Sequence, residues 1–213
     1  MDITPTLVPL GDSALLVRFG TTLSEPANRA AVDFARAIHG RLPLGVMEVV
    51  PSLVSVLVTY DPVSISFDQL AGELRLLSSV KMEADPTAAH PVSVRFDGED
   101  LPDVAAGLEL SPENFVAAHN AAPLRVLATG FAPGFVYCGF HEAALTVPRR
   151  STVRPTVPAG TVLFAAGQTA IAATPIPTGW HVIGHTDFRN FNPAAMPPTI
   201  LRAGDTIHFE AAP

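Results

Sequence analysis

The second half of the chain is interrupted so often by glycine and proline that long helices are excluded there. From Leu124 onward, short apolar runs such as LRVLAT, TVLFAAG and HVIGHT alternate with segments that contain Gly or Pro. Helices usually need about ten or more residues without such interruptions, whereas strands of about four to eight residues fit between them. Many short strands with closely spaced turns are typical of a β-barrel or a β-sandwich. The sequence therefore predicts a β-rich C-terminal domain.

The first 96 residues follow a different pattern, in which short strands alternate with amphipathic helices. Ser24 and Ser66 are suitable N-caps, and the apolar residues after each of them recur at helical spacing. Strands and helices are expected in the order βαββαβ at residues 14–19, 24–42, 46–50, 53–60, 66–77 and 92–96. This order is typical of a ferredoxin-like sandwich.

These two patterns predict an α+β protein with a change of architecture near residue 96. We expect a ferredoxin-like domain over residues 1–96 and a β-rich domain over residues 97–213. The second domain should open with a helix from Ser111 to about Asn120, because Ser-Pro-Glu combines an N-cap, a proline at the first helical position and an acid in the first turn.

The chain carries unusually few charged residues. They make up 15% of its 213 residues, and the net charge is −7. Soluble domains average about 25%, and charge is depleted at the centre of protein interfaces. The shortage therefore favours a large interface with another subunit; the alternative is a composition biased toward alanine and proline. An acidic chain without an apolar run of about twenty residues is expected to bind neither nucleic acid nor a membrane.

Cys138 is the only cysteine, so an intramolecular disulfide is excluded. This composition fits a reducing compartment, and the N-terminus lacks the basic and apolar regions of a signal peptide. We therefore expect a cytoplasmic protein. The seven histidines show no metal-ligand spacing, and no glycine-rich phosphate loop occurs. No cofactor bound by this chain can be identified from its sequence.

The segment from residue 143 to 186 contains no Asp or Glu, whereas it contains Arg149, Arg150 and Arg154. Because arginine binds carboxylates and phosphates through two hydrogen bonds, these residues are candidates for holding an anionic substrate, a carboxylated cofactor or an acidic partner. Alternatively, they pair with acids from elsewhere in the chain, such as those between Asp97 and Asp103.

Loops rich in glycine and aromatic residues adjoin this segment. In GFAPGF, two glycines and a proline can present Phe131 and Phe135 in a fixed geometry. Trp180 follows a turn, where it either packs in the core or forms a platform for a ligand. Gln168 and Thr169 offer neutral polar groups of the kind that orient a ligand amide, although such groups also satisfy turns.

The sequence shows no convincing nucleophile. His119 or His141 could in principle activate Cys138, but the spacing of these residues does not require it. A buried and inert cysteine is the simpler expectation. The catalytic residues thus remain unknown from the sequence.

At these same loops the chain resembles a known family. The matching segments are GDSALLVRFG, PSLVSVLVTYDP, GFAPGFVYCGF, PRRSTVRPTVPAGTV, GQTAI, PTGWHVIGHT and AGDTIHF, which occur in order along nearly the whole chain. They are similar to the carboxyltransferase-domain, subunit 1 family, whose members include allophanate hydrolase subunit 1, the kinase inhibitor KipI and the B subunit of 5-oxoprolinase.

The resemblance implies a ferredoxin-like domain followed by a cyclophilin-like β-barrel. It also implies a partner, since members work with a homologous subunit 2 and, in 5-oxoprolinase, with an A subunit; any ATP or biotin would bind through partner subunits. The family's signature loops fall on the residues Gly130, Phe131, Pro133, Gly134, Phe135, Pro148, Arg149, Arg150, Arg154, Pro158, Ala159, Gly160, Gln168, Thr169, Gly179, Trp180, Gly184 and Thr186. A departure is His185, where members commonly have arginine.

Two functions follow from the resemblance. In the first, the chain is a subunit of an amide-processing hydrolase of the 5-oxoprolinase or allophanate hydrolase type. Its arginines would then hold a carboxylate, Gln168 and Thr169 would orient an amide, and Phe131, Phe135 and Trp180 would shape the pocket. In the second, the chain inhibits a sensor histidine kinase, as KipI does, and has no catalytic activity of its own.

Overall fold

The computed structural model describes residues 3–78 and 87–212. The chain divides into two compact units, Met1–Pro86 and Thr87–Pro213, and each is described by itself. Among the described residues, no helix combines the length and the apolar character that crossing a membrane requires.

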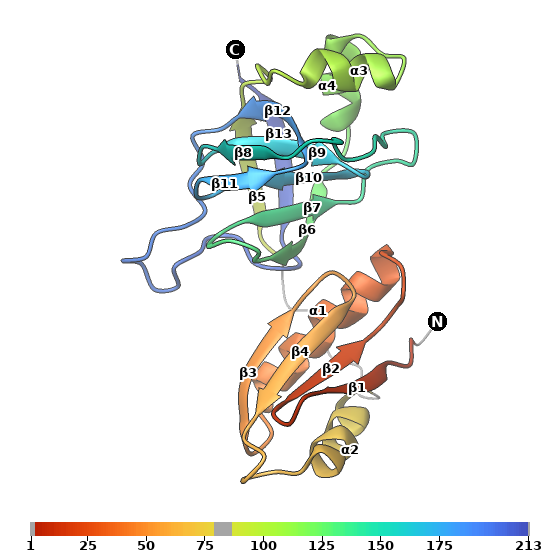
Figure 1. Ribbon diagram of the computed structural model, residues 1–213, viewed down its shortest axis with the longest axis vertical. Coiled ribbons are helices and arrows are strands. Elements are labelled where there is room, and N and C mark those ends of the chain that lie inside the picture. The colour runs from red at the N-terminus through yellow and green to blue at the C-terminus, as the bar shows by residue number, and fades with distance from the viewer. Residues whose placement is uncertain (1–2, 79–86, 213) are drawn as a thin grey trace. The chain divides into compact units, whose positions relative to one another are not determined.

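The first unit is a four-stranded antiparallel sheet covered by two helices (Figure 1). Its elements are β1 (Thr6–Leu10), β2 (Ala14–Arg18), α1 (Glu25–Gly40), β3 (Val46–Pro51), β4 (Ser55–Tyr60) and α2 (Phe67–Ser78), and the strand order is β1-β2-β4-β3. Alternate residues of the central strands, such as Leu15 and Val17, are fully buried and pack with α1 and α2 residues such as Ile38 and Leu74. This alternation is the period of a sheet with one covered face.

The second unit contains a seven-stranded sheet, a two-stranded ribbon and two short helices (Figure 1). Its elements are β5 (Ala89–Val94), α3 (Leu101–Gly107), α4 (Pro112–His119), β6 (Leu124–Thr129), β7 (Val136–Gly139), β8 (Arg154–Val157), β9 (Thr161–Ala165), β10 (Gln168–Ile171), β11 (Ile176–Thr178), β12 (His181–His185) and β13 (Thr206–Ala211). The large sheet has the order β12-β9-β10-β7-β6-β13-β5, and β8 pairs with β11 in the ribbon.

The two edges of the large sheet meet and close it into a barrel. Arg95, directly after β5, exchanges two backbone hydrogen bonds of 2.9 and 2.8 Å with His185 at the end of β12. The approach is so close that a Cβ atom on Gly184 would lie 2.3 Å from the Arg95 carbonyl oxygen. Glycine is therefore required at this seam. The predicted α+β class, with a small sheet-and-helix unit before a β-barrel, is confirmed.

The wall of the barrel is buried on both faces at β9. Val162 and Phe164 point into the barrel, where Phe164 packs edge-on against Phe115 of α4 with ring centroids 5.3 Å apart. Leu163 and Ala165 belong to a second apolar layer, which also contains Trp180 and residues of the β8–β11 ribbon. Phe135, from the GFAPGF segment, belongs to this second layer as well.

The last strand of the predicted βαββαβ order lies in a different sheet from the one expected. The run predicted at 92–96 forms the end of β5, which pairs in parallel with β13 in the barrel. The chain accordingly divides between Pro86 and Thr87, not between residues 96 and 97. The pairing partner of a strand cannot be deduced from its own sequence when that partner comes more than a hundred residues later.

Two further elements were not expected from the sequence. Strand β1 adds an edge to the first sheet although it contains Pro9, and helix α3 begins at Leu101. Proline is tolerated in an edge strand because one side of the strand makes no ladder hydrogen bonds. The predicted helix after Ser111 is confirmed as α4, and the Ser111 hydroxyl accepts a hydrogen bond of 3.2 Å from the Asn114 N–H.

Candidate functional site

Four aromatic side chains of the second unit form a continuous row. The ring centroids of Phe131 and Phe135 are 5.6 Å apart, those of Phe135 and Tyr137 are 4.8 Å apart, and those of Tyr137 and Trp180 are 6.0 Å apart. Such tilted contacts are the geometry that aromatic pairs prefer. We call these four residues the aromatic row. It runs from the exposed ring of Phe131, which is 71% exposed, to the buried ring of Trp180.

The loop before β7 holds the exposed end of the aromatic row in a strained conformation. Gly130, Phe131 and Gly134 have φ angles of 130°, 75° and 70°. A large side chain at positive φ is unfavourable by about 1 kcal/mol or more and persists only where its surroundings enforce it. Here the Gly130 N–H donates a 3.0 Å hydrogen bond to the Phe135 carbonyl oxygen. Strain that presents an aromatic ring to solvent is typical of a binding site.

Arg149 lies at the buried end of the aromatic row. Its guanidinium carbon is 5.6 Å from the centroid of the Trp180 ring, within the range of a cation–π contact. Burial raises the pKa of Tyr137, and the positive charge of Arg149 opposes that rise. Within residues 3–78 and 87–212, no carboxylate forms an ion pair with Arg149, which also lines a cavity of about 510 Å³ with Ser151 and His181. Arg149 is therefore available to an anion.

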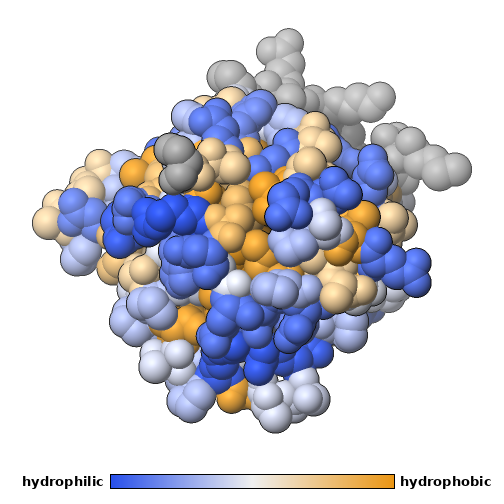
Figure 2. All heavy atoms as spheres, turned by 90° about the horizontal axis from the view of Figure 1, so that it is seen from above, coloured by the Kyte–Doolittle hydropathy of each residue, from blue (hydrophilic) through white to orange (hydrophobic). Residues whose placement is uncertain are grey.

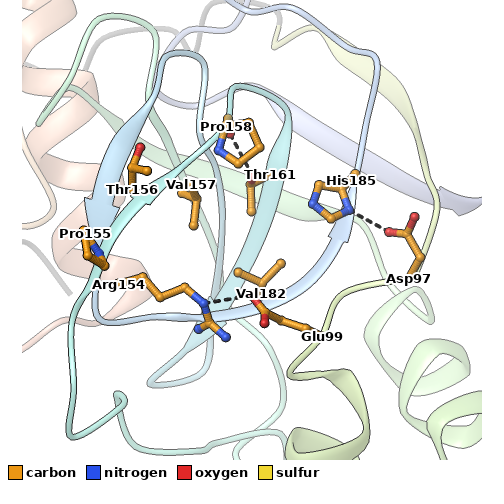
Figure 3. A pocket seen from close by; sticks show the side chains of 10 residues that line it. All are labelled: Asp97, Glu99, Arg154, Pro155, Thr156, Val157, Pro158, Thr161, Val182 and His185. Carbon is orange, nitrogen blue, oxygen red and sulfur yellow. Dashed lines mark hydrogen bonds and ion pairs between the residues drawn. The ribbon is translucent and has the colours of Figure 1, made fainter.

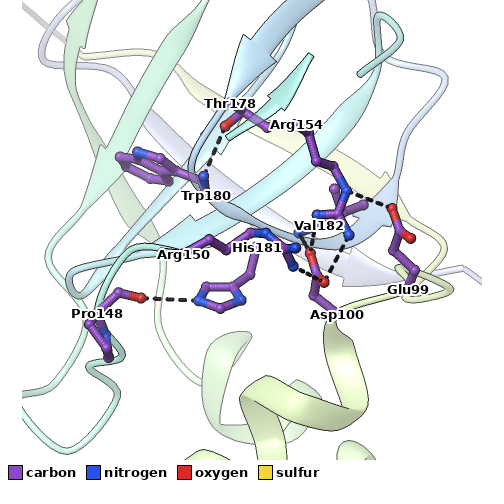
Figure 4. Close-up of polar contacts among 9 residues, drawn as sticks. All are labelled: Glu99, Asp100, Pro148, Arg150, Arg154, Thr178, Trp180, His181 and Val182. Carbon is purple, nitrogen blue, oxygen red and sulfur yellow. Dashed lines mark hydrogen bonds and ion pairs between the residues drawn. The ribbon is translucent and has the colours of Figure 1, made fainter. Parts of the chain in front are cut away.

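Arg150 and Arg154 are engaged by acids of the chain itself (Figure 4). The carboxylate of Asp100, which is 4% exposed, accepts hydrogen bonds from Arg150 Nη1 at 2.5 Å and from Arg154 Nη2 at 2.9 Å and Nη1 at 3.0 Å. It also accepts a 2.7 Å bond from the Val182 N–H, while Glu99 accepts one of 2.8 Å from Arg154 Nε. For these two arginines the structure shows the internal pairing that the sequence analysis named as the alternative.

Gln168 and Thr169 point to opposite faces of the barrel wall, as neighbours in a strand must. Gln168 shares its face with Ala170, the strand partner of Tyr137, and its Oε1 atom is buried with no hydrogen-bond partner among the described residues. Thr169 is fully buried and faces the barrel interior. Gln168 thus lies on the side of the aromatic row, and Thr169 does not.

Thr169 connects two histidines inside the barrel. Its hydroxyl is 2.8 Å from Nε2 of His119 and 2.8 Å from Nε2 of His141, and the two imidazole centroids are 4.7 Å apart. Burial lowers the pKa of His119 to about 4, and burial together with the neighbouring His119 lowers the pKa of His141 to about 3. Both rings are therefore neutral at pH 7. No motif reveals this pair, because its members come from the end of α4 and from the loop after β7.

Cys138 belongs to the core of the barrel and is completely buried. Burial raises the pKa of its thiol, so the thiolate is suppressed at neutral pH. Across the sheet, Cys138 pairs with Thr169, whose hydroxyl already binds both histidines. The structure thus supports an inert cysteine.

Comparison with known proteins shows that the chain is similar to B subunits of 5-oxoprolinase. The chain is 34% identical over 215 residues to the B subunit of 5-oxoprolinase from Bacillus subtilis, and the match covers 94% of this chain and 90% of the relative. It is 32% identical over 207 residues to the B subunit of 5-oxoprolinase from Haemophilus influenzae, and that match covers 95% of this chain and 96% of the relative.

Two solved structures share the fold of this chain within longer proteins. The crystal structure of TTHA0988 superimposes on this chain with a TM-score of 0.84 at 38% identity. The match covers 94% of this chain but only 40% of the TTHA0988 chain. The urea amidolyase of Kluyveromyces lactis shares the fold with a TM-score of 0.77 at 15% identity, over 100% of this chain and 15% of that chain. Because residues 5–201 match the family model as well, the chain belongs to the carboxyltransferase domain, subdomain C and D, family.

Proposed function

We propose that the chain is the B subunit of an ATP-dependent 5-oxoprolinase, a hydrolase acting on a C–N bond, and that it works with a homologous subunit 2 and an A subunit. The observation that carries this proposal is its identity of 34% and 32%, over nearly the full length, to two proteins of that name. This chain covers only 40% of the TTHA0988 chain. That difference in length supports the proposal that this chain works together with further subunits. No observation favours the alternative of a KipI-like kinase inhibitor.

Within this function, we assign binding of the substrate carboxylate to Arg149. It is the arginine of the predicted set that carries no internal ion pair among the described residues, and it lies against the aromatic row. The half-buried ring of Tyr137 offers an apolar face to the carbon ring of 5-oxoproline, Trp180 packs beside it and shapes the pocket, and the amide of Gln168 can orient the lactam. Arg150 and Arg154 act by holding Asp100, and Thr169 acts by ordering the barrel interior.

The direct test uses the chain co-purified with subunit 2 and the A subunit encoded near it. Release of glutamate from 5-oxoproline, dependent on ATP and on the presence of this chain, is the expected result. Recovery of a histidine kinase in place of these subunits, without glutamate release, would reject the proposal in favour of the inhibitor.

Replacement of Arg149 by glutamine is expected to raise the KM for 5-oxoproline about tenfold or more, because a charge-assisted hydrogen bond to a carboxylate contributes about 1.5–3 kcal/mol. Steady-state kinetics of the reconstituted complex measure this change. Arg202→Gln is the matched control, since Arg202 is an exposed arginine of the same unit outside the aromatic row. Equal KM values for the two variants would remove Arg149 from the site.

The isolated chain is expected to associate with itself, and co-expression with subunit 2 is expected to suppress this. Several large apolar side chains of the first unit are exposed, among them Leu44 at 78%, Met47 at 74% and Val63 at 94%. Figure 2 shows, in addition, a hydrophobic area bordered by hydrophilic side chains. Light scattering after size-exclusion chromatography measures the molecular mass of the isolated chain. If the chain were a monomer across a wide concentration range, its low content of charged residues would reflect only a composition biased toward alanine and proline.

A further inference from the structure

A pocket beside the barrel seam carries charged side chains that already have partners within the chain. Its volume is about 470 Å³, and Arg154 and His185 line it (Figure 3). Arg154 binds Glu99 at 2.8 Å, and His185 lies 2.7 Å from Asp97. The first sheet differs, because the charged side chains of its strands form no ion pair with any other described residue.

The face of the first sheet that points away from α1 carries an unbroken apolar row. Figure 1 shows the four strands in front of this helix, and the residues that pack against it alternate with residues that point the other way. On this other face Val8 pairs with Leu16, and Leu16 pairs with Leu57. Leu57 pairs in turn with Val50 on the edge strand β3. We call these four residues the apolar row, and the side of the sheet that carries them the open face.

The apolar row is partly accessible to solvent. Val50 is 37% exposed, whereas Val8, Leu16 and Leu57 are half-buried. Leu10, which follows Val8 on the same face of β1, is 45% exposed. Because removal of apolar surface from water is favourable, the open face is suited to packing against another apolar face.

Two opposite charges flank the apolar row. Arg18 pairs with Ser55 of β4, and Glu48 pairs with Thr59 of the same strand. Ser55 comes two residues before Leu57 and Thr59 two residues after it, so the two charges share the open face but lie on opposite sides of the row. They are the only charged residues in the four strands. Both are exposed, and neither forms an ion pair within residues 3–78 and 87–212.

A two-fold rotation about the apolar row brings these charges together. When a second copy lies face to face with the first, this rotation places each row on its counterpart and makes the strands of the two sheets antiparallel. The side of the row that carries Arg18 in one copy then faces the side that carries Glu48 in the other. Their strands, β2 and β3, are two positions apart in the sheet, about 10 Å, which the two long side chains can span. By symmetry the contact forms twice.

From this match of charge and apolar surface we propose that the open face binds a second copy of this chain, with Arg18 of each copy paired with Glu48 of the other. The open face measures about 19 by 17 Å, given four strands of five or six residues. It is smaller than the face of a standard interface, which buries about 800 Å² per partner. We therefore expect a dimer that dissociates, with a Kd on the order of 10–100 μM.

This dimer goes beyond the proposed function, which does not require it. It has a fixed stoichiometry of two, and it is separate from the association expected through Leu44, Met47 and Val63. It should therefore persist when subunit 2 is bound.

Reversal of one charge tests the pairing. Arg18→Glu or Glu48→Arg sets like charges opposite each other twice and should raise the Kd of the dimer at least about tenfold. The double variant Arg18→Glu/Glu48→Arg restores opposite charges and the parental net charge, so its Kd should return to within about threefold of the parental value. Sedimentation velocity at concentrations from about 1 μM to 1 mM measures each Kd. Arg41→Glu is the matched control, since Arg41 is exposed in the same unit but lies outside the four strands.

A charge within the apolar row tests the packing. Val50→Asp should raise the Kd at least about tenfold, because the carboxylate would lose water on dimerisation without gaining a partner. Val63→Asp should dimerise as the parent does, since Val63 is 94% exposed and lies outside the four strands. Thermal unfolding followed by circular dichroism verifies that each variant is folded.

Three results would each overturn the assignment: a monomer at all concentrations, equal Kd values for the parent and the single charge variants, or a folded double variant that stays monomeric. Loss of the dimer on binding of subunit 2 would do so as well, because the open face would then belong to that subunit. The dimer of the isolated chain is measured without glutamate release, so this proposal and the proposed function fail separately.

Discussion

Acidification from pH 7 to pH 4.5 is expected to lower the free energy of unfolding of the second unit by several kcal/mol. The cause is the buried pair His119 and His141, whose pKa values fall from 6.5 to about 4 and about 3. In the unfolded chain both imidazoles take up protons below about pH 6.5, whereas in the folded barrel they stay neutral. Stability is therefore fully present above pH 6.5 and is lost as the pH falls toward the folded values, on the order of 2–3 kcal/mol per histidine at pH 4.5.

The fluorescence of Trp180, the only tryptophan, reports unfolding of this unit specifically. Urea titrations at pH 7, 5.5 and 4.5 give the slope of stability with pH. In His119→Gln or His141→Gln that slope should be smaller by about the contribution of one histidine, whatever the stability of the variant at pH 7. Replacement of the exposed His208 by glutamine should leave the slope unchanged. If the free energy of unfolding of both core variants changed with pH as steeply as that of the parent, the expectation would be contradicted.

Replacement of Asp100 by alanine is expected to destabilise the second unit by about 3–5 kcal/mol. Asp100 is 4% exposed and accepts four hydrogen bonds, from Arg150, from both terminal nitrogens of Arg154 and from the Val182 N–H. Removing one partner of a buried ion pair leaves uncompensated charge in a medium of low polarity. Here the charge would be that of two arginines whose side chains are 25% and 18% exposed.

Urea unfolding at pH 7 measures this loss, and Asp103→Ala is its control. Asp103 lies in helix α3, which Asp100 precedes as the N-cap residue, but it is exposed, so its removal should change the stability by less than about 1 kcal/mol. Asp100→Asn keeps an acceptor for the Val182 N–H but removes the charge. Its free energy of unfolding should therefore lie between those of Asp100→Ala and Asp103→Ala. If Asp100→Ala and Asp103→Ala were equally stable, the Asp100 network would contribute nothing to the barrel.

The sequence located the residues around the candidate site better than it identified their roles. The two glycines and the proline of GFAPGF predicted that Phe131 and Phe135 are held in a fixed geometry, and both rings belong to the aromatic row. The acid-free segment identified three candidate arginines and left open whether they bind an anion or pair with acids from elsewhere in the chain. Which of the three is available could not be predicted, because Asp100 lies about fifty residues away in the sequence and reaches Arg150 and Arg154 only through the fold.

Local patterns by themselves determined most of the helices and strands of this protein. Apolar spacing and capping residues indicated α1, α2 and α4, and runs of β-branched residues between Gly and Pro indicated the strands of the barrel. Such patterns succeed because they reflect interactions within a few residues of one another.

Only the tertiary structure decided which strands pair and which polar groups meet. It moved β5 from the first sheet to the barrel, joined Arg95 to His185 at the seam and placed Thr169 between two histidines. Each of these contacts links residues that are distant along the chain. Their formation depends on burial of whole faces and on closure of the sheet, and no short stretch of sequence carries that information.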